Sequence, residues 1–192
     1  MCIRDSPRPA LHLALDQAGR LLTTTDRTHA ANPTPCTDYD VARLIDHLQA
    51  VVRRIGTVAD GGHFSEVPRE WPPTDNWTTT WDEGRARTDQ ALAAADLDMS
   101  VAAPWGEATL RTAAAMYVSE LATHAWDLAV ATGRRDELDG AVAEIALPIA
   151  RNGVPAERGE HVPFADVVPV PDDAPAYDRL AAWCGRDPGW EN

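Results

Sequence analysis

The stretch from Ala108 to Thr132 reads ATLRTAAAMYVSELATHAWDLAVAT and is followed by Gly133. Its large apolar side chains recur at the three- and four-residue spacing of one buried helical face: Leu110, Tyr117, Leu121 and Leu128. Glycine is common just after a helix end because it adopts the left-handed backbone conformation without strain. We therefore predict a long helix over residues 108–132 that ends at Gly133.

The same periodicity in other segments predicts further helices. They cover residues 9–26, 38–55, 79–95, 136–151 and 177–184. Thr37 or Asp38 would cap the second of these helices, and Gly56 and Gly61-Gly62 would mark its end. Residues 98–107 alternate weakly in hydrophobicity and contain Pro104-Trp105-Gly106, which predicts a short hairpin-like excursion.

Helices without a convincing strand run indicate an all-α fold. We expect a four-helix bundle over residues 7–150 and a C-terminal extension, residues 151–192, that packs on it. Residues 57–78 lack periodicity and are expected to form an ordered crossover that rims a pocket. Residues 1–6 are expected to be non-native or disordered, because they show no pattern at all.

The composition excludes several classes of partner. The 17 basic residues, all arginine, and 30 acidic residues give a net charge of −13, which repels nucleic acid and anionic membrane surfaces. The three cysteines form no C-x-x-C pair, so neither a disulfide framework nor a thiolate zinc knuckle is indicated. With no apolar run near the roughly 18 residues of a membrane span, we expect a cytoplasmic protein that is a monomer or a homodimer.

Glu120 and His124 lie four residues apart, so a helix would place their side chains next to each other. His124 falls inside the apolar stripe and Glu120 at its edge, and burying both without a partner would be costly. His47 sits at the margin of the apolar stripe of the second helix and can face them across the bundle. Two histidines and one glutamate form a known catalytic zinc set with one open position, so we predict a metal site.

Alternatives remain for this site and its neighbours. A Glu-His pair at this spacing is common by chance and is usually exposed. Asp127 would either orient or replace a ligand, or be a surface charge. Trp126 would anchor the C-terminal segment. Cys36 is expected to be a buried apolar residue, because a helix starting near Tyr39 puts His47 about 12 Å further along the axis.

Several segments in this order resemble the DinB-like superfamily, most closely its branch of mycothiol-dependent maleylpyruvate isomerase N-terminal domains. The resemblance covers about residues 9–190. It is carried by Thr34-Pro35-Cys36-Thr37-Asp38-Tyr39, Asp46-His47-Leu48, Trp105-Gly106-Glu107, His124-Ala125-Trp126-Asp127 and Gly185-Arg186-Asp187-Pro188. The family implies a four-helix bundle that holds one divalent metal, usually zinc, through His47, Glu120 and His124.

The resemblance also implies a chemistry. Family members use a small-molecule thiol, mycothiol in actinobacteria, and the arginine-for-lysine bias fits such a source. We expect a mycothiol-dependent transferase or isomerase acting on a small electrophile, with zinc, or else nickel, manganese or iron. Arg85 or Arg87 would bind the acidic substrate or cofactor, or else be solvated helix charges. A non-enzymatic metal-binding or stress-associated bundle is the alternative function, and a bundle without metal is the third.

Overall fold

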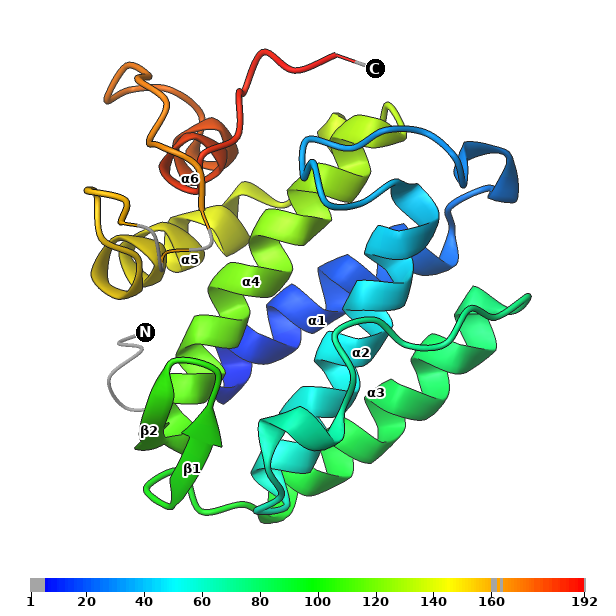
Figure 1. The fold of residues 1–192 in the computed structure, drawn as a ribbon, viewed down its shortest axis with the longest axis vertical. Helices are drawn as coiled ribbons and strands as arrows, with labels where there is room; N and C mark the ends of the chain where they lie inside the picture. Colours follow the sequence, from blue (N-terminus) through cyan, green and yellow to red (C-terminus); the bar gives the residue numbers. More distant parts are fainter. Residues whose placement is uncertain (1–5, 160–161, 163, 192) are drawn as a thin grey trace.

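The computed structural model describes residues 6–159, 162 and 164–191, and this part of the chain is mostly helical (Figure 1). The helices are α1 (Arg8–Thr23), α2 (Val41–Ala59), α3 (Trp77–Ala94), α4 (Leu110–Ala131), α5 (Gly140–Gly153) and α6 (Ala176–Trp183). One antiparallel hairpin joins β1 (Ser100–Ala103) to β2 (Gly106–Thr109). The predicted all-α fold with a hairpin excursion is confirmed.

The first four helices form the bundle. Helix α4 packs on α1 and α2, and α3 packs on α2 and α1. Figure 1 shows α5 and α6 together on the other side of α4 from α2 and α3. The core between the helices is filled by fully buried leucines and aromatic residues, among them Leu15, Leu22, Leu44, Leu48, Leu121 and Trp126. The assignment of residues 7–150 and 151–192 to separate units stays a prediction.

Helix α2 differs from its prediction at its start, and it passes the first of its two predicted end signals. Asp40, and neither Thr37 nor Asp38, caps it by accepting a hydrogen bond from the backbone N–H of Arg43. The helix continues through Gly56 to Ala59, and Gly61 follows this end with a φ of 85°. Gly56 is there for packing, since a Cβ at this position would lie 2.7 Å from the hydroxyl of Thr88 on α3.

Helix α4 has clear start and stop signals. The side chain of Thr109 caps its first turn by accepting a hydrogen bond from the N–H of Thr112. Gly133 follows the helix with a φ of 68°, and the N–H of Arg134 donates to the carbonyl of Ala129 at 2.7 Å. The predicted stop at Gly133 is confirmed.

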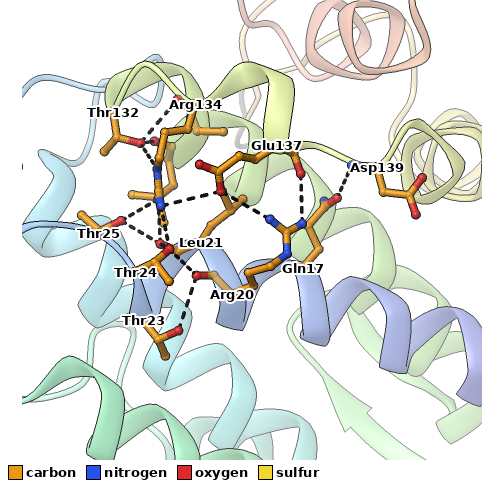
Figure 2. A network of polar contacts seen from close by, with 12 residues as sticks. Gln17, Arg20, Leu21, Thr23, Thr24, Thr25, Thr132, Arg134, Glu137 and Asp139 are labelled. Carbon is orange, nitrogen blue, oxygen red and sulfur yellow. Dashed lines mark hydrogen bonds and ion pairs between the residues drawn. The ribbon is translucent and has the colours of Figure 1, made fainter.

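A polar network ties the end of α4 to the end of α1 (Figure 2). The guanidinium of Arg134 donates to the hydroxyls of Thr24 and Thr25 and to the carbonyl of Leu21, at 2.7 to 2.8 Å. Arg20 reaches the backbone carbonyl of Glu137 at 3.0 Å. The carbonyl of Leu21 lies in the last turn of α1, where carbonyls lack helical partners, and these bonds connect that end of α1 to the segment after α4.

Within the described ranges, no helix is both long enough and apolar enough to cross a membrane.

Candidate metal centre

The structure brings together the three residues predicted from the sequence. His47 comes from α2, and Glu120 and His124 come from α4. Nε2 of His47 lies 3.4 Å from Oε1 of Glu120, and the two imidazole rings meet edge-on with centroids 4.9 Å apart. One potential ligand atom from each residue lies within 4.8 Å of the other two. Packing of α2 against α4 therefore creates a compact group of two imidazoles and one carboxylate.

Hydrogen bonds fix the orientation of both imidazoles. Nδ1 of His47 lies 2.8 Å from the carbonyl oxygen of Arg69, and Nδ1 of His124 lies 3.0 Å from Oδ2 of Asp127. A carbonyl and a carboxylate only accept, so each Nδ1 carries a proton, and Nε2 is the ring atom that remains for a cation. Metal-binding histidines adopt this arrangement, so the donor set fits a divalent cation.

Asp127 is fully buried, and both of its oxygens are engaged. Arg186, which follows α6, contacts Oδ1 at 3.2 Å and Oδ2 at 3.1 Å. Burial alone would raise the pKa of Asp127, but Arg186 and His124 lower it overall. Of the alternatives for Asp127, the surface charge is wrong and the orienting role agrees with these contacts.

The electrostatics favour the protonation states of metal ligands. Burial lowers the pKa of His124, which keeps its imidazole neutral. Burial would raise the pKa of Glu120, but the hydrogen bond and charge of His47, together with His124 and Arg54, lower it overall. A neutral His124 imidazole and an ionised Glu120 carboxylate are the protonation states in which these two residues bind a cation.

The three side chains open into a cavity of about 860 Å³. Its walls come from the segment before α2, the crossover between α2 and α3, the hairpin tip, α4 and the C-terminal segment. Apolar side chains form much of the lining: Phe64, Val67, Trp105, Met116 and Phe164. Charged side chains enter it as well: Asp38, Arg54, Arg69 and Arg186. Residues 57–78 were predicted to rim a pocket, and five of them line this cavity: Phe64, Ser65, Val67, Pro68 and Arg69.

The expected burial of Cys36 away from the site is wrong. Its thiol lies within 4.8 Å of potential ligand atoms of His124 and Asp127, and it lines the cavity. A backbone bridge between Pro33 and Asp40 folds the intervening residues back on themselves. The distance along the α2 axis therefore does not give the separation between Cys36 and His47. Burial, followed by the charge of Asp127, raises the pKa of this thiol.

The structure does not bring Arg85 and Arg87 to the cavity. Arg85, on α3, contacts Asp16 at 2.7 Å and Asp89 at 2.8 Å, and Arg87 is exposed. Neither residue lines the cavity. Three other arginines, which the sequence interpretation missed, line the cavity: Arg54, Arg69 and Arg186. Binding of a substrate or cofactor by Arg85 or Arg87 stays a prediction.

The position of Arg54 in the cavity could have been predicted from the sequence, because Arg54 follows His47 by seven residues and thus shares its helical face. Arg69 and Arg186 lie in irregular segments without such a signal. Trp126 is fully buried and does not line the cavity, and the guanidinium of Arg135 lies 5.5 Å from its ring centroid.

Comparisons with known proteins agree with this architecture. Residues 11–129 match the family model described as Mycothiol maleylpyruvate isomerase N-terminal domain, a range that contains His47, Glu120 and His124. Uncharacterized proteins MT0763 and Rv0738 of two Mycobacterium tuberculosis strains are each 32% identical to the chain over 183 residues. The match covers 94% of this chain and 97% of each relative. No solved structure matches. The chain belongs to the mycothiol maleylpyruvate isomerase N-terminal domain family.

Proposed function

We propose that this protein is a metalloenzyme that uses a small-molecule thiol, mycothiol, to attack a small electrophile by transfer or isomerisation. His47, Glu120 and His124 would hold one divalent cation, with zinc as the first candidate. When bound, such a cation lowers the pKa of a coordinated thiol and so supplies a thiolate at neutral pH.

The observation that carries this proposal is the pair of pre-oriented imidazoles beside Glu120. The carbonyl of Arg69 and the carboxylate of Asp127 each accept the Nδ1 proton, which leaves both Nε2 atoms as donors to a cation. Three protein ligands leave a further position open, unlike a closed structural site with four.

The surroundings of the three side chains support a catalytic metal ion and not a purely structural one. The side chain of Glu120 is 29% exposed, and it faces a cavity whose 860 Å³ lies within the usual range for ligand sites, about 300–1,000 Å³. Apolar rings at the rim, Phe64, Trp105 and Phe164, would limit the access of water to a reacting thiolate. The family match supports mycothiol as the thiol.

Cobalt substitution tests the proposal. We expect Co²⁺ to bind the wild-type protein in equimolar amount and mycothiol to produce a thiolate-to-cobalt charge-transfer absorption. Glu120→Ala and His124→Ala should lose metal and thiol-transfer activity together, whereas Glu83→Ala, at an exposed position on α3, should keep both.

Two outcomes would refute the proposal. A cobalt spectrum that does not respond to the thiol would indicate an ion that only stabilises the bundle. Protein purified without chelator that contains no metal, and that binds none when it is added, would leave an ordinary Glu-His pair.

A further inference from the structure

The imidazole of His47 is held at its edge and at its face by two different segments. At the edge, its Nδ1 lies 2.8 Å from the carbonyl oxygen of Arg69, in the crossover between α2 and α3. At the face, the ring of Tyr39, in the segment before α2, stacks on it with centroids 5.0 Å apart and planes 23° apart. The edge contact limits rotation within the ring plane and the face contact limits tilting, so the direction of Nε2 depends on both.

The side chain of Arg69 connects these two contacts. Its Nε donates a hydrogen bond to the hydroxyl of Tyr39 at 2.8 Å, and its Nη2 pairs with Asp38. Tyr39 is only 5% exposed, and a buried hydroxyl needs a hydrogen-bond partner. The same hydroxyl lies 3.3 Å from Nδ1 of His47. Arg69 therefore supplies the carbonyl at the edge of the imidazole and also holds the ring that covers its face.

The charge of Arg69 does not account for this arrangement. A positive charge beside a site for a divalent cation opposes binding of that cation, but Asp38 neutralises this guanidinium in an ion pair. The two side chains of the pair are 66% and 59% exposed, and exposed ion pairs contribute little to the stability of a fold. The buried contact of the guanidinium is the one with Tyr39, and that contact acts on the orientation of His47.

We propose that Arg69 is a positioning residue for the candidate metal ligand His47 and that its side chain acts through Tyr39. This inference rests on the proposed function, in which His47 binds the cation through Nε2. The guanidinium keeps the phenol ring stacked on the imidazole, so Nδ1 stays at the carbonyl of Arg69 and Nε2 stays directed to Glu120. A ligand that is oriented beforehand loses less freedom when the cation binds, which raises the affinity.

Competition with a chelator for Co²⁺ tests the role of the side chain. Arg69→Met keeps the backbone carbonyl, so we expect the metal affinity to fall by about 10-fold, at the lower end of the effect of removing a group that orients a ligand. The urea midpoint should change little, because the ion pair is exposed. Arg69→Lys keeps a charged donor and should restore part of the affinity. Arg111→Met removes another arginine that is paired with an exposed aspartate, Asp98, and that does not line the cavity, so it should match the wild type.

A double-mutant cycle tests whether Arg69 acts through Tyr39. Tyr39→Phe removes the hydroxyl but keeps the ring, and it should weaken metal binding by a factor similar to that of Arg69→Met. In the Tyr39→Phe background, Arg69→Met should add little further loss, because the two residues share one contact. Full additivity of the two losses would overturn the inference, and so would wild-type metal affinity in a folded Arg69→Met protein. Loss of thiol-transfer activity at unchanged metal affinity would overturn it as well, because Arg69 would then act on the substrate.

Nitrogen NMR of the histidine side chains in metal-free protein separates this inference from the proposed function. The neutral form of His47 should carry its proton on Nδ1 in the wild type, whereas Arg69→Met should show a mixture of both tautomers; His47→Gln identifies the signals. If the wild type binds no cobalt, the proposed function fails, and the tautomer still reports whether Arg69 orients the imidazole. If cobalt binds while Arg69→Met changes neither the tautomer nor the affinity, only the positioning role fails.

Discussion

The guanidinium of Arg186 spans both carboxylate oxygens of Asp127, at 3.2 Å from Oδ1 and 3.1 Å from Oδ2. Asp127 in turn accepts the Nδ1 proton of His124. Arg186 lies in the segment after α6, beyond the residues matched by the family model. A residue of the C-terminal segment is therefore connected, through one buried carboxylate, to a candidate metal ligand on α4.

Replacement of Arg186 should affect stability and metal binding together. Arg186→Met would leave the buried charge of Asp127 without its partner, and breaking such a pair costs about 3–5 kcal/mol. Loss of a group that orients a ligand typically lowers metal affinity by about 10- to 100-fold. Urea unfolding and competition with a chelator would measure the two effects.

Arg186→Lys and Arg151→Met are the matched variants for this prediction. Lysine keeps the charge and should restore part of the affinity, whereas Arg151 is exposed and should not matter. Wild-type metal affinity in a folded Arg186→Met protein would show that Asp127 orients His124 without help from the C-terminal segment.

The candidate site was predictable wherever helical periodicity decides the direction of a side chain. A residue's place in an apolar stripe fixes its face, so His47 and His124 could be assigned to facing sides of a bundle before any distance was known. The stop at Gly133 follows from a local backbone requirement. Such signals lie within a few residues of the feature that they determine.

The features that the sequence did not predict concern contacts between distant segments. Cys36 reaches the site because Pro33 and Asp40 pair through their backbones, a turn that helical periodicity does not describe. Arg85 forms an ion pair with Asp16 on α1, and the sequence around Arg85 contains no signal that predicts this partner. Of the glycines predicted at the end of α2, Gly56 lies inside the helix and packs closely against Thr88, 32 positions later.

Gly56→Ala should destabilise the protein even though alanine favours helices. The added Cβ would lie 2.7 Å from the hydroxyl of Thr88 and 3.2 Å from its Cα. Overpacking of this kind costs about 1–3 kcal/mol, which exceeds the gain of about 1 kcal/mol in helix propensity. Thermal or urea unfolding would measure the difference.

Gly140→Ala serves as the control for that substitution. Gly140 lies at the start of α5, and no neighbouring heavy atom of the described residues comes within 4 Å of the position that a Cβ would take. We therefore expect a neutral or slightly stabilising effect. Equal effects of the two substitutions would contradict the packing explanation.

Asp46 should make stability depend on pH. Burial, and next the charge of Glu70, raise the pKa of Asp46 from 3.8 to about 6. A raised pKa in the folded state means that the carboxyl favours folding when protonated, so its contribution is complete below pH 3.8 and is lost as the pH rises through about 6. The difference between these two pKa values corresponds to a change of roughly 3 kcal/mol at most in the free energy of unfolding.

Asp46→Asn removes this penalty. The variant should be more stable than the wild type above pH 6 by about 1–3 kcal/mol, and the difference should vanish near pH 4. Urea unfolding of chelator-treated protein across this range would measure it, since His47 is the next residue and a bound metal would interfere. Asp82→Asn, at an exposed position on α3, should show no such trend; a difference that is constant with pH would contradict the ionisation argument.

Cys36 decides whether the cobalt experiment reports on an added thiol or on the protein itself. Its sulfur lies within 4.8 Å of potential ligand atoms of His124 and Asp127, but it does not form one such group with His47 and Glu120. We therefore expect cobalt-loaded wild type to show no thiolate-to-cobalt absorption before mycothiol is added. Cys36→Ser should bind cobalt with an affinity within a few-fold of the wild type and should still develop the band with mycothiol. An absorption in the absence of added thiol that disappears in Cys36→Ser would make Cys36 a fourth protein ligand, and the site would then lack the open position that thiol chemistry requires.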